Sequence, residues 1–240
     1  MKRRGKIRRG IVPAALIALF LAALVASVPL LQTGIPGGPL AVAGREEIPA
    51  YSGEPFVIVN GDVPYFTREE KEEAAGAGNF FRYAELDSLG RAGAACACVS
   101  EETVDESDRT ELQELRPSGW KQNRFPELIP DNSGYLMNRG HLIMRYLGGA
   151  DDLRNIIAMT QSCNQQMEAH EKRVLHHVYS EGDHVLYRVT PVYRGAEPVA
   201  RGVLMEAASL EDDSFGFCVF YYNEQPGIAL DHMTGESRPQ

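Results

Sequence analysis

Three side chains in the middle of the chain have the types and spacing needed for metal-assisted hydrolysis. A neutral imidazole at His141, in a segment that resembles a strand, could act as a general base near pH 7. Asn164 and Glu171 are seven residues apart, so in a helix their side chains point the same way. Amide and carboxylate oxygens suit Mg²⁺, directly or through its waters. A histidine facing them across a metal would suit phosphodiester hydrolysis, and Arg139 and Arg145 could contact phosphates.

The same residue types also have simpler structural explanations. A lone histidine in a strand is commonly a hydrogen-bonded structural residue, and asparagines near turns are commonly caps. The helical histidines do not indicate a zinc site, because His170 and His177 lack a further ligand in a matching frame and no His-Glu-x-x-His occurs. From the residue types alone, the catalytic and the structural interpretation both stay open.

A resemblance to a known family favours the catalytic interpretation. Asn138-Arg139-Gly140-His141 resembles the Asp-Arg-Gly-His motif of the DNA/RNA non-specific endonucleases, members of the ββα-metal (His-Me finger) superfamily. Asn155 with the two isoleucines that follow it, and Cys163-Asn164-Gln165, fall at that family's spacing. The resemblance covers nearly all of the chain after residue 44, including Ile48–Gly53, Pro117–Trp120, His184–Pro191, Gly202–Ala207, Asn223–Ile228 and Asp231–Gly235. The first two of these segments resemble the membrane-anchored Gram-positive branch, which includes DNA-entry nucleases.

This resemblance implies a role for each candidate site residue. His141 matches the general base, and Asn164 matches the ligand of a Mg²⁺ cofactor, with Mn²⁺ as an alternative ion. Asn155 matches a supporting active-site asparagine and Arg139 the arginine of the motif. Glu171 matches the acidic residue that orients metal-bound water and completes the metal site.

One of these assignments has an alternative, and one position of the motif departs from the family. Glu168 lies one helical turn before Glu171 and could take its role. Asn138 stands where many relatives have aspartate, so it can accept a hydrogen bond but brings no charge to the histidine or the metal. The branch with similar flanking segments often has asparagine there, so we do not interpret Asn138 as a sign of inactivation.

The elements that must position these residues follow from the hydrophobic pattern. Residues 135–144 are expected to form a strand or strand pair, and residues 161–179 a helix with one apolar face. Residues 184–193, 202–210 and 215–222 are strand candidates rich in Val, Tyr and Phe, with shorter strands at 55–60 and 228–230. Thr67 and Glu70 have the spacing of a capping box before a short acidic helix. We therefore expect one α+β domain at residues 45–240, with a mostly antiparallel sheet, in which the resemblance implies a ββα-metal motif.

The N-terminal 44 residues are expected to direct export. Residues 1–10 contain six basic and no acidic residues, and should stay in the cytoplasm. Residues 11–31 form an uncharged run long enough to span a membrane as a helix. This length favours an uncleaved anchor, while Ala41–Ala43 offers a small-residue site for signal cleavage. After a linker at residues 32–44, the domain is expected outside the cytoplasm, on a single-pass membrane anchor or secreted after cleavage.

The charge balance limits how the chain could hold a nucleic acid. The chain has 24 basic and 33 acidic residues, a net charge of −9, which argues against binding by bulk positive charge. Without the six basic residues of the N-terminus, 18 basic face 33 acidic residues, a net −15. Residues 138–173 are nearly neutral, with five basic and four acidic residues, and a bound Mg²⁺ would make this segment positive. We therefore expect transient, salt-sensitive contacts at one local site.

The four cysteines leave their redox state open. An exported domain could form disulfides between Cys96, Cys98, Cys163 and Cys218, with three connectivities. Buried thiols that behave as small hydrophobic residues are an equal alternative. The Cys96-x-Cys98 spacing does not indicate zinc.

The sequence thus predicts an exported, Mg²⁺-dependent endonuclease that cleaves DNA, and RNA as an alternative, with no small-molecule cofactor. Two other interpretations stay open. One is a catalytically silent nucleic-acid-binding surface protein on the same fold, and the other is a secreted toxin nuclease.

Overall fold

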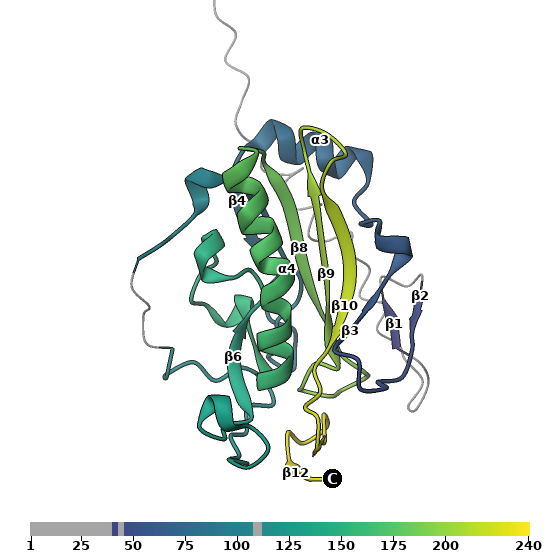
Figure 1. Cartoon of the computed structure of the whole chain (residues 1–240), viewed down its shortest axis with the longest axis vertical. Coiled ribbons are helices and arrows are strands. Elements are labelled where there is room, and N and C mark those ends of the chain that lie inside the picture. Colours follow the sequence, from purple (N-terminus) through teal and green to yellow (C-terminus); the bar gives the residue numbers. More distant parts are fainter. Residues whose placement is uncertain (1–39, 43–45, 108–111) are drawn as a thin grey trace, which may run out of the picture.

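A computed structural model describes residues 40–42, 46–107 and 112–240 (Figure 1). The predicted basic segment 1–10 and apolar segment 11–31 lie outside these residues, as does most of the predicted linker. Within the described part of the chain, no helix is both long and apolar enough to cross a membrane. Leu40–Val42, inside the predicted linker, is a strand, β1, that pairs antiparallel with β2 (Glu46–Ile48).

The main sheet has six strands in the order β3-β10-β9-β8-β5-β4, and every neighbouring pair is antiparallel. Its bounds are β3 Phe56–Ile58, β4 Phe80–Tyr83, β5 Ala95–Val99, β8 Val185–Val192, β9 Gly202–Ser209 and β10 Gly216–Tyr222. The expected fold class, α+β with a mostly antiparallel sheet, is confirmed. The three long strands predicted from their Val, Tyr and Phe content form the middle of the sheet.

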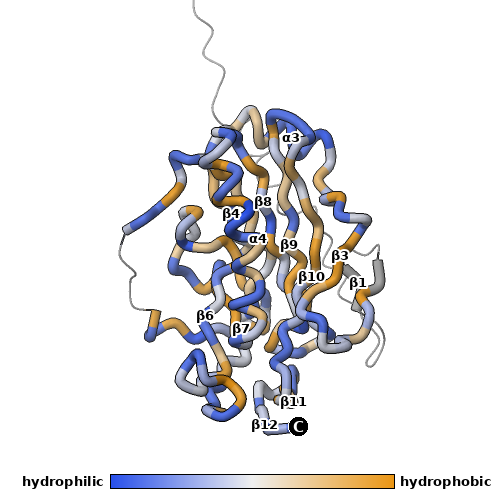
Figure 2. The backbone as a smooth tube through the Cα atoms, viewed as in Figure 1, coloured by the Kyte–Doolittle hydropathy of each residue, from blue (hydrophilic) through white to orange (hydrophobic). Residues whose placement is uncertain are grey.

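The two faces of this sheet pack against different helices, since alternate residues of a strand point to opposite faces. On one face, the odd-numbered residues of β5, β8, β9 and β10 join the apolar side of α4 (Gln161–Ser180) in the largest hydrophobic cluster. On the other face, Leu186 and Ala208 pack with Ala74 of α3 (Arg68–Ala77). Figure 2 shows this pattern as hydrophobic central strands beside a mostly hydrophilic α3.

Both helices begin where the sequence favours a cap. The Thr67 side chain accepts a hydrogen bond from Glu70 N, and the Glu70 carboxylate accepts one from Thr67 N, which completes the predicted capping box. Thr160 caps α4 by accepting a hydrogen bond from Cys163 N. The apolar face predicted for α4 is buried at Met167, Val174 and Val178.

A hairpin leads directly into α4. β6 (Met137–His141) pairs antiparallel with β7 (Ile156–Thr160), and the helix starts at the next residue. This β6-β7-α4 unit lies beside the main sheet, on the face that α4 covers (Figure 1). It is the ββα arrangement that the sequence motif implies.

The remaining elements are short. They are β11 Ile228–Leu230 and β12 Ser237–Pro239, which pair with each other, and the 3-10 turns η1 Asn60–Asp62, η2 Glu101–Thr103, η3 Pro130–Asn132, η4 Arg145–Leu147 and η5 Leu153–Asn155. All four cysteines are buried free thiols. They therefore pack as small hydrophobic residues in this structure and form no disulfide.

Candidate functional site

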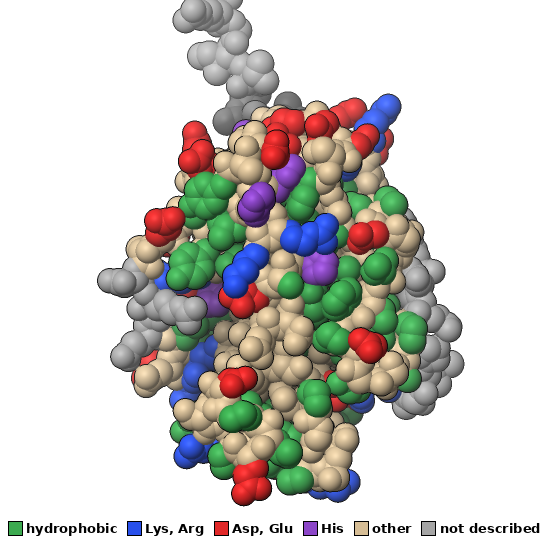
Figure 3. Space-filling view, viewed as in Figure 1, with side chains coloured by type: hydrophobic (Ala, Val, Ile, Leu, Met, Phe, Trp, Pro, Cys, Tyr) green, Lys and Arg blue, Asp and Glu red, His purple; other side chains and the backbone are tan. Residues whose placement is uncertain are grey.

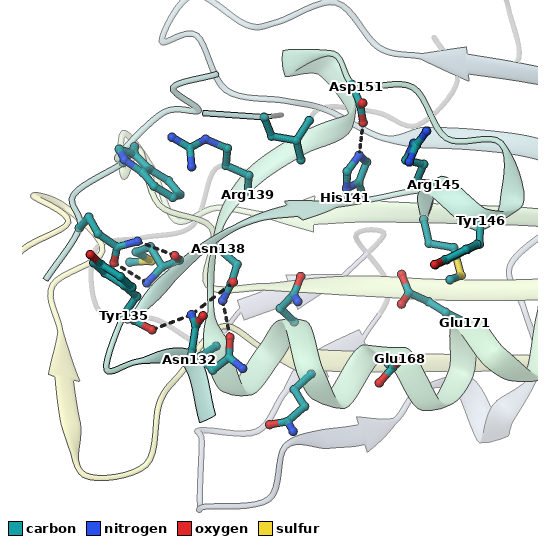
Figure 4. Close-up of a pocket in the computed structure, with 18 of the residues that line it drawn as sticks. Asn132, Tyr135, Asn138, Arg139, His141, Arg145, Tyr146, Asp151, Glu168 and Glu171 are labelled. Atoms are coloured by element: carbon teal, nitrogen blue, oxygen red, sulfur yellow. Dashed lines mark hydrogen bonds and ion pairs between the residues drawn. The ribbon is translucent and has the colours of Figure 1, made fainter. Parts of the chain in front are cut away.

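A pocket of about 520 Å³ opens between β6, the first three turns of α4 and residues from elsewhere in the chain, among them Asp105, Leu112 and Trp120. Figure 4 shows β6 and α4 presenting their polar side chains to this space. The lining residues include four of the five predicted site residues, and also Asn138, Arg145 and Glu168. They are Asp105, Leu112, Trp120, Gln122, Asn132, Tyr135, Met137, Asn138, Arg139, His141, Met144, Arg145, Tyr146, Asp151, Gln161, Asn164, Gln165, Glu168 and Glu171.

The strand β6 places Arg139 and His141 on one side, because they are two residues apart. Figure 4 shows both side chains leaving the strand on that side, while Asn138 leaves it on the other. Gly140 between them faces β7, where a Cβ atom would lie 2.7 Å from Met159 Cβ. A side chain there would separate the two strands, so the glycine of the motif keeps the hairpin closed.

His141 is mostly buried, with 16% of its side chain exposed. Its Nε2 lies 2.8 Å from Oδ1 of Asp151, which is also mostly buried (Figure 4). The histidine is thus held at the pocket wall by a carboxylate. An imidazole that lines a polar pocket and contacts an acceptor can take up a proton from a bound molecule.

The helix α4 supplies the oxygen donors. Asn164 is exposed to the pocket, while Glu171 lies two turns further along, buried at 8% exposure. Burial, and to a lesser extent the nearby Glu168, raises the pKa of Glu171 to about 8. Glu168 also lines the pocket but is exposed and pairs with Lys172. Either glutamate could therefore still be the acidic residue of the site. Glu171 is the more buried of the two.

Arg139 is engaged with the chain itself. Its Nε donates to Leu115 O at 2.7 Å and its Nη2 donates to Gln113 O at 2.9 Å. The guanidinium also lies over the Trp120 ring, 4.3 Å from its centroid. Burial, followed by the nearby Arg116, lowers the pKa of Arg139. In this structure the motif arginine therefore fastens the segment that forms one wall of the pocket.

Asn155 does not line the pocket. It is fully buried, and its side chain bonds to the backbone of the loop between β6 and β7. Its side chain therefore holds the loop behind the pocket, and its part in the reaction stays a prediction.

Asn138 is bonded at the junction of β6 and α4. Its Nδ2 donates to Oε1 of Gln161 at 2.7 Å, and its Oδ1 accepts from Asn132 at 3.5 Å. The neutral amide therefore acts as both donor and acceptor here. An aspartate could only accept, which gives a structural reason for asparagine at this position.

Asp151 and two tyrosines of the pocket, Tyr135 and Tyr146, could not be identified from the sequence. Asp151 follows His141 by ten residues inside a loop, and no periodicity connects the two. Tyr135 and Tyr146 line the pocket with 40% and 43% of their surface exposed, a large exposure for such residues. Trp120, which also lines the pocket, lies beneath the Arg139 guanidinium.

The donors that this pocket offers to a cation are mainly side-chain oxygens. Among the described residues, no group of three or more His, Cys, Asp or Glu is arranged to hold a metal ion. The pocket nevertheless has four acidic side chains, from Asp105, Asp151, Glu168 and Glu171, against the two arginines. A cation beside Glu171 would favour its carboxylate form, which burial alone disfavours. Its oxygen-rich lining fits a hydrated divalent cation that uses few protein ligands, such as Mg²⁺.

Many acidic side chains of the surface lie away from this pocket. Figure 3 shows acidic side chains gathered at the end of the molecule where α3 lies. Four of the ten residues of α3 are glutamates, and none of them lines the pocket. The acidic net charge is therefore not concentrated at the pocket.

Comparison with known proteins gives consistent matches. A family model described as DNA/RNA non-specific endonuclease matches residues 69–210, which include every predicted site residue. A deoxyribonuclease from Streptococcus dysgalactiae subsp. equisimilis is 30% identical over 143 residues, 55% of this chain. The chain covers 43% of that relative, less than half of its length.

Solved structures share the fold. NucA from Streptococcus agalactiae, in a crystal structure with magnesium ion bound, has a TM-score of 0.64 and 22% identity, over 79% of this chain and 91% of that one. The structure of Sda1 nuclease with bound zinc ion has a TM-score of 0.57 and 27% identity, over 67% of this chain and 81% of that one.

Proposed function

Because the chain belongs to the DNA/RNA non-specific endonuclease family, we propose that it hydrolyses phosphodiester bonds of DNA, and of RNA, with little sequence preference. The reaction depends on a divalent cation, Mg²⁺ or Mn²⁺, and takes place outside the cytoplasm. The observation that carries this proposal is the pocket in which His141 of β6 and Asn164 and Glu171 of α4 come together.

Two residues of the pocket would hold the cation. Asn164 would contribute its amide oxygen and Glu171 its carboxylate, directly or through water. Such an ion lowers the pKa of bound water and stabilises charge on the phosphate and the leaving oxygen. The pocket carboxylates would otherwise repel a polyanion, which supports a cation as a requirement for binding the substrate.

The side chains divide the remaining work. His141 accepts a proton from the attacking water, while Glu171 orients water near Asn164. Arg139 holds the segment of residues 112–116 through Leu115 O and Gln113 O, and Leu112 of this segment lines the pocket. The exposed rings of Tyr135 and Tyr146 offer surfaces on which bases can stack without a preference for sequence.

Export is proposed from the N-terminal sequence. Six basic residues precede an uncharged run at residues 11–31, a pattern that orients a membrane helix with the following domain outside. We assign this run to an uncleaved anchor. Mass analysis of the protein from membranes tests this, because a mature N-terminus after residue 43 would show cleavage and secretion.

The test of the proposed activity is cleavage of supercoiled plasmid by the protein in Mg²⁺, compared with His141→Ala. We expect the variant to lose at least about 100-fold in rate, the usual contribution of a general base. His176→Ala is the matched control, since His176 is exposed on α4 and does not line the pocket. If His141→Ala cleaves as fast as the control, the assignment of the base is wrong.

The same assay separates the substrates. Single-stranded RNA, single-stranded DNA and duplex DNA are incubated under one set of conditions, and cleavage of both nucleic acids is expected. A parent protein that cleaves none of them, with Mg²⁺ or Mn²⁺ present, would contradict the proposed function and favour a silent nucleic-acid-binding protein.

A further inference from the structure

The contact between His141 and Asp151 joins a β-strand residue to a loop residue. The two are ten positions apart, both line the pocket, and Nε2 lies 2.8 Å from Oδ1. The side chains expose only 16% and 22% of their surface, so solvent screens this pair weakly. Nε2 is the ring nitrogen that faces the carboxylate.

The loop that carries Asp151 is held in place by buried groups. Asn155 accepts a hydrogen bond from Ile143 N at 2.9 Å and donates to Ile143 O at 3.0 Å. It also donates to Ala150 O at 2.9 Å, and Ala150 is the residue before Asp151. One fully buried side chain thus clamps both the start and the end of the loop.

Two further features fix the end of the loop next to Asp151. Ala150 N donates to the Tyr83 hydroxyl at 3.0 Å, which ties the loop to strand β4. A Cβ atom at Gly149 would lie 1.8 Å from Ile143 O, so only glycine allows this close approach of the two loop ends. The start of the loop is anchored by Leu142 and Ile143, both at 0% exposure. The carboxylate of Asp151 is therefore presented by a rigid, packed segment.

We propose that Asp151 is a positioning residue for His141, and that Asn155 acts on the same histidine by holding Asp151. The inference rests on the proposed function, in which His141 is the general base. The carboxylate keeps the imidazole in one orientation, and it stabilises the positive charge that the ring gains on accepting a proton. Asp151 does not touch the substrate in this role.

The first test compares Asp151→Asn with Asp152→Asn. Both changes remove one negative charge from the same loop, but Asp152 bonds to Arg154 and does not line the pocket. We expect Asp151→Asn to lower kcat by 10- to 100-fold, on the order seen for residues that orient an active-site histidine. KM and the melting temperature should stay near those of Asp152→Asn. Asp151→Glu keeps the charge and should recover part of the lost rate.

The second test is a double-mutant cycle with His141→Ala. If Asp151 acts through the histidine, Asp151→Asn should change the residual rate of His141→Ala by less than about two-fold. An equal loss in both backgrounds would overturn the proposal, because Asp151 would then act on the metal or the substrate directly. Parent-like kcat in Asp151→Asn would overturn it as well.

A third measurement does not need nuclease activity. The ring-nitrogen NMR signals of His141 report the acceptor at Nε2, and we expect them to shift in Asp151→Asn but not in Asp152→Asn. If the protein cleaves no nucleic acid but the signals shift, the proposed function is wrong while the contact between Asp151 and His141 is supported. Unshifted signals in an active enzyme would overturn the positioning role and leave the nuclease assignment intact.

Discussion

Asn138 Nδ2 donates to Oε1 of Gln161 at 2.7 Å, which joins strand β6 to the first residue of α4. This bond sits at the corner of the hairpin-helix unit that carries the histidine and the oxygen donors. The neutral residue of the motif therefore has a structural task that an aspartate could not perform as a donor.

The role of Asn138 is tested by two substitutions. Asn138→Ala removes the bond to Gln161, so we expect a loss of about 1 kcal/mol in the free energy of unfolding and a melting temperature lower by about 2–4 °C. Asn138→Asp should keep most of the activity, because the Gln161 amide can turn over and donate to the carboxylate. Calorimetry and plasmid cleavage check both variants. A large gain in rate from the aspartate would show instead that the missing charge limits this enzyme.

Arg139 is expected to act mainly through the wall that it fastens. Arg139→Lys keeps a positive charge but cannot make both bonds, to Leu115 O and Gln113 O, while stacking on Trp120. We expect a loss of about 1–2 kcal/mol in stability, faster proteolysis within residues 112–116 and a higher KM. Limited proteolysis followed by mass spectrometry measures this. Arg68→Lys, an exposed arginine of α3 paired with Glu72, is the control. Unchanged proteolysis in Arg139→Lys would mean that the arginine does not fasten the wall.

The sequence predicts the long strands and the helix α4 better than the short strands beside them. α4 was predictable because its apolar residues recur at helical spacing, and β8, β9 and β10 because they are runs of seven or eight residues rich in apolar and strand-forming residue types. β5 was not predicted: Ala95–Val99 contains two alanines and two cysteines, which have weak strand propensity, and it forms a strand because both neighbours pair with it. β7 was not assigned either, because Ile156–Thr160 is a short apolar run without alternation.

The candidate site divides in the same way. His141, Asn164 and Glu171 could be named because a motif and a helical spacing mark them. The actions of Asn155 and Asp151 could not be deduced, since both depend on how a fourteen-residue connection between β6 and β7 closes on itself. Closure of a loop is set by tertiary contacts such as the Ala150–Tyr83 bond, which leave no periodic signal in the sequence.

The four thiols are expected to be unreactive in the folded protein. Burial raises the pKa of Cys96 to about 12 and that of Cys98 to about 11, so neither forms the nucleophilic thiolate at pH 8. Iodoacetamide should modify none of the four in the native state, and all four in guanidinium without a reductant, as counted by intact mass. Fewer than four modifications in the denatured, unreduced protein would indicate a disulfide.

The same pKa shifts predict how stability depends on alkaline pH. A folded-state pKa above the unfolded value of 9.0 means that the native state holds the thiol proton more tightly. This contribution to stability is present in full below pH 9 and is lost as the pH rises toward 11 and 12. Cys98→Ala should therefore show a shallower fall in the free energy of unfolding above pH 9 than the parent. An identical slope would contradict a buried, protonated Cys98.

A substitution of Asn164 should change the concentration of Mg²⁺ that cleavage requires. Its amide is exposed to the pocket, and no group of three or more acidic, His or Cys residues in the described chain is arranged to replace it. We expect EDTA to abolish cleavage and Mg²⁺ or Mn²⁺ to restore it. In Asn164→Ala, the Mg²⁺ concentration for half-maximal rate should rise by at least about 10-fold. Asn164→Asp should fall between this variant and the parent, because it retains an oxygen ligand.

The matched control for Asn164 is Gln166→Ala, since Gln166 is an exposed amide on the same helix that does not line the pocket. Its Mg²⁺ dependence should equal that of the parent. Isothermal titration with Mg²⁺ alone separates binding from catalysis, because a lost ligand weakens binding even without substrate. If Asn164→Ala binds and uses Mg²⁺ as the control does, the ion is held by other pocket oxygens, with Glu171 and Glu168 the next residues to change.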